Sequence, residues 1–136
     1  MTTQHQGSCL CQAVKFSLCG EFSSFFLCHC SRCQKDTGSA HAANLFAPEA
    51  TLNWLQGETS VTTYQHANTR HSKSFCKHCG SALPTVAASI GCVVVPAGCL
   101  DSEVTIAPTA KIFVKSRASW AKDLNAVPSC DGLPGK

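Results

Sequence analysis

Cys76-Lys77-His78-Cys79-Gly80 is the stretch of sequence that decides the fold. Two residues separate its cysteines, so a tight turn can direct both sulfurs toward one metal ion. The glycine after the second cysteine accepts the positive φ that such a turn often needs. This spacing is typical of a zinc knuckle. Ordinary buried cysteines or a redox pair are the alternatives that the motif leaves open.

A second pair, Cys9-Leu10-Cys11, supplies the matching ligands near the start of the chain. In an extended strand, residues i and i+2 project from the same face, so we expect a strand whose two sulfurs reach one ion. A metal that joins these two distant pairs closes a long loop, which is where a metal contributes most to folding. The sequence therefore predicts a structural zinc held by Cys9, Cys11, Cys76 and Cys79.

Between these pairs lies Cys28-His29-Cys30-Ser31-Arg32-Cys33, which has three cysteines and no close fourth. Four thiolates close a zinc site, whereas three leave a coordination position for water or substrate, so we predict a catalytic zinc at Cys28, Cys30 and Cys33. His29 should point away from it as a packed residue. A fourth ligand could come from a distant cysteine, although each candidate is more typical of a small buried residue or a surface thiol: Cys19, Cys92, Cys99 and Cys130.

Two basic residues, Arg32 and Lys35, lie beside the three-cysteine set. Positive charge lowers the pKa of neighbouring thiols and attracts anionic substrates. We interpret both as candidate substrate-binding residues, with ordinary solvated surface charges as the alternative.

The 136-residue length predicts a single domain spanning 1–136, with its core at about 7–128. The first residues lack the basic and apolar regions of a secretory signal, and the count of 11 cysteines is odd, so we expect metal-binding thiols in the cytoplasm rather than disulfides. Seven ligand thiolates and two Zn²⁺ would together cancel the formal charge of +3. With no basic cluster and no long apolar run, neither nucleic acid nor a membrane is an expected partner.

Short apolar runs between turn residues predict strands, and only brief helices. We expect one helix at Ser31–Thr37, which Gly38 would stop, and a helical turn near 119–124. The result is a mainly β fold of small antiparallel sheets, with strands at 13–18, 42–46, 52–55, 61–64, 71–75, 82–83, around Val86, at 92–95 and at 111–114.

A zinc with three thiolate ligands can bind an external thiolate and polarise a carbonyl, so a thiol and an aldehyde that meet there would form a hemithioacetal. The sequence shows no paired carboxylates and no Ser/His/Asp set to supply the proton. A water, or a hydroxyl or histidine from the site wall, is expected to do so.

Taken together, these residues resemble the family of glutathione-dependent formaldehyde-activating enzymes, also called the centromere-protein-V/GFA domain. The resemblance covers roughly residues 7–128. Its marks are GSCLCQAV at 7–14, CHCSRCQKDTG at 28–38, FCKHCGS at 75–81 and SRASW at 116–120. Two residues depart from the family pattern without touching a proposed ligand: Gln12, where glycine is common, and Lys111, near where histidine is common.

The resemblance implies a zinc-stabilised, Mss4-like β-tent with the structural and catalytic sites assigned above, and hence two Zn²⁺ per chain. It implies a carbon–sulfur lyase of the S-(hydroxymethyl)glutathione synthase type, acting on glutathione and formaldehyde or another small aldehyde. An open three-cysteine site can lose its metal or oxidise, so the second site can be partly empty in a purified sample.

Two other hypotheses are compatible with the sequence. The first is a non-enzymatic, Mss4-like zinc module for a protein partner, which would need an exposed apolar patch and a filled fourth position at the second metal. The second is a carrier that holds the glutathione adduct without accelerating its formation. The oligomeric state is not predicted.

Overall fold

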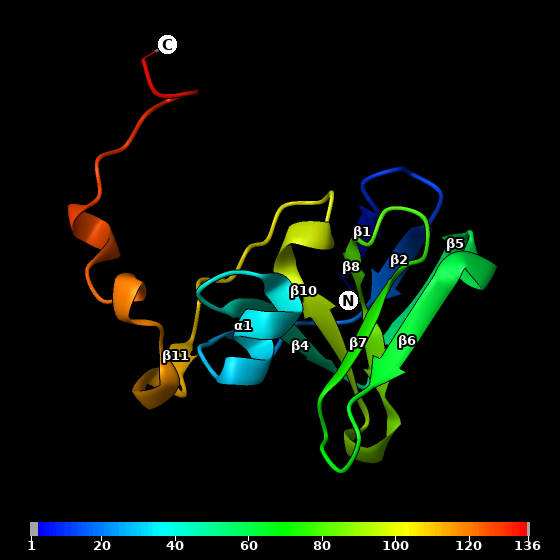
Figure 1. Ribbon diagram of the computed structural model, residues 1–136. Coiled ribbons are helices and arrows are strands. Elements are labelled where there is room, and N and C mark those ends of the chain that lie inside the picture. Colours follow the sequence, from blue (N-terminus) through cyan, green and yellow to red (C-terminus); the bar gives the residue numbers. More distant parts are fainter. Residues whose placement is uncertain (1–2, 136) are drawn as a thin grey trace.

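The computed structural model describes residues 3–135, in which strands form three small sheets and confirm the predicted mainly β fold (Figure 1). Neighbouring strands are antiparallel, apart from β11 beside β3. The sheets, in spatial order, are β1 (Gln4–Ser8), β2 (Lys15–Cys19) and β5 (Thr51–Gln56); β11 (Ala110–Ile112), β3 (Ser24–Cys28), β4 (Ala42–Pro48), β10 (Cys92–Pro96) and β9 (Thr85–Ala87); and β6 (Val61–Gln65), β7 (Ser72–Cys76) and β8 (Ala82–Leu83).

The main core lies where these sheets face one another. Alternate residues of the central strands are fully buried, including Phe16 and Leu18 of β2, Leu45 of β4 and Val95 of β10. Two proposed metal ligands, Cys9 and Cys76, belong to this core, whereas Cys28 and Cys33 form a separate small cluster with Ala42. The four-cysteine set therefore reaches into the main core through Cys9 and Cys76, and the three-cysteine set lies outside it.

The one α-helix among residues 3–135 is α1 (Ser31–Thr37), with the bounds that the sequence predicts. Cys30 caps its start, because the Cys30 sulfur accepts a hydrogen bond from the Cys33 N–H at 3.4 Å. Gly38 ends it in the left-handed conformation, with φ of 66°. Short 3-10 helices make up the remaining helical structure: η1 (Glu58–Ser60), η2 (Ala88–Ile90), η3 (Ala97–Cys99), η4 (Val114–Ser116), η5 (Ser119–Ala121) and η6 (Leu124–Ala126).

The first cysteine pair departs from the sequence-based expectation. Cys9 and Cys11 do not lie in a strand but in the turn between β1 and β2, where Gln12 has a φ of 68°. Strand β1 is not predicted from the sequence, because its segment is mostly polar. Only His5 and Gly7 of this strand are buried. It pairs with the apolar strand β2, and His5 packs on the Phe22 ring with centroids 4.4 Å apart.

The end of the chain also departs from expectation. The strand predicted at 111–114 stops at Ile112, because Phe113 takes a left-handed φ of 56° and η4 follows. From there the chain runs away from the sheets (Figure 1), and Ala121 is the only buried residue of the stretch 113–135. Among residues 3–135, no helix has both the length and the apolar character needed to cross a membrane.

Candidate metal centres and the adjoining cleft

The four predicted structural ligands meet at one point. The sulfurs of Cys9, Cys11, Cys76 and Cys79 all lie within 4.8 Å of one another. Two of the separations are 3.6 Å, between Cys9 and Cys11, and 3.9 Å, between Cys11 and Cys76. A tetrahedral zinc with Zn–S bonds of about 2.3 Å needs sulfurs about 3.8 Å apart. The cluster therefore fits a tetrahedral metal ion.

The first pair of sulfurs lies in the β1–β2 turn, and the second pair lies at the end of β7 and in the β7–β8 turn that follows. Gly80 has a φ of 75°, as the sequence predicts for a zinc knuckle. The Ser81 hydroxyl joins the turns, because it accepts hydrogen bonds from the Leu10 N–H at 2.8 Å and the Cys79 thiol at 3.3 Å. A backbone N–H also points at the Cys9 sulfur, donated by Val14 at 3.2 Å.

The thiol pKa values of this cluster diverge strongly. Interactions with Ser81, first with its side chain and then with its backbone, lower the pKa of Cys79 to about 5. The Ala13 backbone favours ionisation of Cys11, but burial and the neighbouring cysteines outweigh it and raise the pKa of Cys11 to about 11. Closely spaced thiolates repel one another, so full ionisation of the cluster needs a cation among them.

The second cluster joins the sulfurs of Cys28, Cys30 and Cys33, again within 4.8 Å of one another. Cys28 ends β3, Cys30 keeps extended dihedrals, and α1 brings Cys33 back toward both, as the spacing predicts. Among residues 3–135, no other Cys, His, Asp or Glu joins the cluster. None of the four cysteines considered as a fourth ligand lies there: Cys19, Cys92, Cys99 and Cys130.

Ionisation is also uneven in the three-cysteine cluster. Burial raises the pKa of Cys28 and, with the two neighbouring sulfurs, that of Cys33. Burial acts in the same direction on Cys30, but hydrogen bonds, above all from the Cys33 N–H, lower its pKa on balance. Three soft sulfur donors that lie this close together fit a thiophilic divalent cation such as zinc. Both cysteine clusters can therefore bind metal ions.

His29 lies outside the cluster, although its neighbours on both sides belong to it. Its ring is buried against His41, with centroids 5.1 Å apart. Burial, followed by the charges of His41, Lys111 and Arg117, lowers the pKa of His29. His29 is thus a packed residue outside the three-cysteine cluster.

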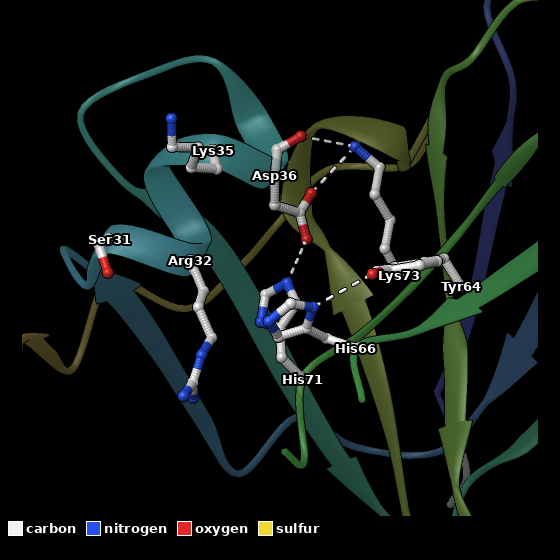
Figure 2. A pocket seen from close by; sticks show the side chains of 8 residues that line it. All are labelled: Ser31, Arg32, Lys35, Asp36, Tyr64, His66, His71 and Lys73. Atoms are coloured by element: carbon white, nitrogen blue, oxygen red, sulfur yellow. Dashed lines mark hydrogen bonds and ion pairs between the residues drawn. The ribbon is translucent and has the colours of Figure 1, made fainter. Parts of the chain in front are cut away.

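A cleft of about 450 Å³ opens between α1 and the hairpin of β6 and β7 (Figure 2). Both predicted substrate-binding residues, Arg32 and Lys35, line it from the helix. Neither cation forms an ion pair with any residue of 3–135. Its lining combines three cations with one carboxylate and two histidines, from Ser31, Arg32, Lys35, Asp36, Tyr64, His66, His71 and Lys73.

Asp36 links the helix to the hairpin across this cleft (Figure 2). Asp36 Oδ1 forms an ion pair with Lys73 Nζ at 2.9 Å, and the same ammonium donates a hydrogen bond to the Asp36 backbone carbonyl at 2.7 Å. Asp36 Oδ2 lies 2.8 Å from His71 Nε2. These three residues also line a neighbouring cavity of about 300 Å³, whose wall includes Cys33. The Asp36 network therefore lies between the basic cleft and the three-cysteine cluster.

Sequence reasoning did not find His71, Asp36 or Lys73. The only available signal was that Asp36 follows Cys33 by three residues on a predicted helix, which places both on neighbouring parts of one face. Nothing in the sequence indicates that the β6–β7 hairpin meets α1.

Comparison with known proteins supports this fold and identifies a family. A family model described as glutathione-dependent formaldehyde-activating enzyme matches residues 4–116. A crystal structure of a Rhodobacter sphaeroides protein aligns with a TM-score of 0.59, over 78% of this chain and 98% of that chain. The sequence identity is 21%, so this likeness concerns the fold alone. A comparison with curated proteins gives no match.

Proposed function

Because the chain belongs to the family of glutathione-dependent formaldehyde-activating enzymes, we propose that it is a zinc-dependent carbon–sulfur lyase. Its reaction is the formation or cleavage of S-hydroxymethylglutathione, or of a related adduct of a thiol and a small aldehyde. The observation that carries this proposal is the cluster of Cys28, Cys30 and Cys33, which no fourth ligand joins among residues 3–135.

Each cysteine cluster has its own role in this proposal. Cys9, Cys11, Cys76 and Cys79 hold a structural zinc, and Cys28, Cys30 and Cys33 hold a second. Zinc at the second cluster would supply a Lewis-acid centre with an affinity for a further thiolate. Two Zn²⁺ per chain are thus required for the full activity. Eleven free cysteines suit a reducing compartment such as the cytoplasm.

Arg32 and Lys35 bind the anionic part of the thiol in this proposal. Glutathione carries two carboxylates, and the cleft beside α1 presents two cations that have no ion-pair partner among the described residues. An arginine can hold a carboxylate with two parallel hydrogen bonds, which fixes its orientation. The cleft and the metal cluster share α1, so a thiol held by its carboxylates lies near both.

The direct test follows the approach to equilibrium of glutathione with formaldehyde by exchange NMR. The zinc-loaded protein should accelerate the reaction. Cys33→Ser should remove the acceleration, while the metal ion of the four-cysteine cluster stays bound. Arg32→Ala should raise KM for glutathione by about tenfold, the loss of one charged hydrogen-bonding group, and leave KM for neutral 2-mercaptoethanol unchanged. Lys15→Ala, at the exposed first residue of β2, is the charge-matched control. No acceleration at saturating zinc would contradict the proposal.

The other two hypotheses make different predictions in the same assay. A carrier binds glutathione without changing the rate. The protein-binding module would need a filled fourth position at the second metal, and the cluster has no fourth ligand among residues 3–135. The open cluster therefore favours an enzyme or a carrier over the protein-binding module, and the rate measurement separates the first two.

A further inference from the structure

The proposed reaction needs a group that moves one proton, and the structure offers a candidate. Thiol and aldehyde combine without net loss of protons, but the sulfur must lose its proton before it attacks, and the aldehyde oxygen must gain one afterwards. A histidine suits this exchange, because imidazole changes its charge between about pH 5 and 8. We propose that His71, held by Asp36, is this proton-transfer group; the proposal rests on the proposed function.

The first argument is the bond between the two residues. His71 Nε2 lies 2.8 Å from Asp36 Oδ2, and the Asp36 carboxylate also accepts from Lys73. An ionised carboxylate can only accept, so Nε2 donates its proton, and the lone pair of a neutral imidazole is left on Nδ1. No residue of 3–135 forms a hydrogen bond with that Nδ1. Asp36 thereby fixes the tautomer and the ring, as carboxylates do for catalytic histidines.

The second argument is location. His71 and Cys33 line the same cavity of about 300 Å³, and His71 also lines the basic cleft that contains Arg32 and Lys35. Asp36 stands one helical turn after Cys33, and side chains with this spacing are neighbours on a helix surface. His71 is thus one of the residues that line both the cavity with Arg32 and the cavity with Cys33. The ring is accessible, since 20% of the side-chain surface is exposed.

The step is balanced without an added oxidant or reductant. His71 Nδ1 accepts the thiol proton as the sulfur becomes a thiolate. The sulfur electron pair then forms the bond to the aldehyde carbon, and the carbonyl π pair moves onto oxygen. That oxygen takes the proton back from His71, which yields the hemithioacetal and a neutral imidazole. Cleavage of the adduct follows the same path in reverse.

The charged surroundings of His71 define what a pH profile would report. Asp36 and Lys73 lie closest, and the remaining titratable groups of the two adjoining cavities come from α1 and from the hairpin: Arg32, Cys33, Lys35, Tyr64, His66 and Arg70. Among these, only His66 is a second imidazole, and its Nδ1 is 3.1 Å from the Tyr64 hydroxyl rather than a carboxylate. His66 therefore serves as a comparison for the Asp36-held imidazole within the same cleft.

The test compares zinc-loaded wild type with His71→Gln, Asp36→Asn and His66→Gln. Glutamine keeps a donor toward Asp36 but cannot exchange a proton. We expect His71→Gln to lower kcat by on the order of 100-fold, to keep KM for glutathione, and to flatten the pH dependence of the rate. Asp36→Asn should lower kcat by less, and His66→Gln should keep the pH profile. Elemental analysis and circular dichroism show whether metal content and fold are retained.

A second measurement does not depend on turnover. S-methylglutathione has the carboxylates of the substrate but no thiol, and its binding should shift the imidazole NMR signals of His71. If His71→Gln keeps both kcat and the pH dependence, or if the His71 signals stay unchanged on binding, the proposal is wrong while the enzyme function stands. If wild type does not accelerate the reaction at all, the proposed function fails first and the proton-transfer role fails with it.

Discussion

At the scale of the residue, Gly57 shows how one position can set a turn. It follows β5 with a φ of 73°, and a Cβ at this position would lie 2.1 Å from the Ala13 carbonyl oxygen. Both conditions exclude a side chain, because left-handed backbone is costly for other residues and a backbone oxygen cannot move away cheaply.

We therefore predict that Gly57→Ala lowers the free energy of unfolding by more than about 3 kcal/mol, combining the backbone cost with the clash. Gly91→Ala is the control, because Gly91 has a φ of 58° but no atom within 4 Å of the added Cβ. It should cost only about 1 kcal/mol. Urea unfolding of the two variants measures the difference, and equal losses would mean that the contact with Ala13 has no energetic effect.

Residue-level signals predicted some turns and missed others. Gly38 and Gly80 both mark turns that the sequence indicates. Gln12 gave no such signal, although it has a φ of 68° just after the first cysteine pair. Its side chain offsets part of the backbone cost, because Gln12 Nε2 donates to the Cys9 carbonyl at 3.1 Å. The glycine that is common here in the resembling family is explained by this conformation.

At the scale of the element, the two cysteine clusters join different parts of the fold. One ties the β1–β2 turn to the β7–β8 turn, and its ligands Cys9 and Cys76 lie in the main core. The other lies within the continuous segment from the end of β3 to α1, outside that core. A link between distant segments constrains the unfolded chain far more than a link within one short segment.

Cys76→Ser should therefore unfold or aggregate the protein, whereas Cys33→Ser should lose one metal ion and keep the fold. The physical reason is that binding free energy at the first cluster is folding free energy. Metal analysis, far-UV circular dichroism and thermal unfolding of both variants provide the comparison. Equally severe effects would show that the two centres do not divide structural and catalytic work as proposed.

The local sequence pattern predicts individual helices and strands, but not the contacts between elements that are distant in the sequence. The bounds of α1 were predicted because its cap, its length and Gly38 are all local. Strand β1 was missed because it becomes a strand only by pairing with β2, with His5 packed on Phe22. The ion pairs of Asp36 with Lys73 and His71 were missed for the same reason, since they depend on where the β6–β7 hairpin meets α1.

At the scale of the whole molecule, Cys99 couples stability to alkaline pH. It lies in the main core at the end of η3, and the next residue, Leu100, bridges to Gly7 of β1. Burial raises the pKa of the Cys99 thiol to about 12, from an ordinary value of 9.0. Between these values the unfolded chain has lost this proton and the folded chain still holds it, so stability must fall as pH rises.

We expect this thiol to remove about 2 kcal/mol of stability between pH 8 and 10.5. Cys99→Ala lacks the titrating group, so its stability should decline less over the same range, even if the variant is less stable at pH 8. Guanidinium unfolding at both pH values measures the two slopes. Parallel declines in wild type and variant would assign the alkaline loss to other groups, including the metal ligands.

The three proposed catalytic ligands lie within six consecutive residues, Cys28–Cys33, and this has a consequence for the evolution of the protein. A few codon changes in this one stretch would abolish the chemistry that we propose and leave a heritable, folded scaffold. The four-cysteine cluster would allow no such step if, as we predict, each change there unfolds the protein. Within a lineage, catalytic ability can therefore be lost far more readily than shape, and inactive descendants would keep Cys9, Cys11, Cys76 and Cys79.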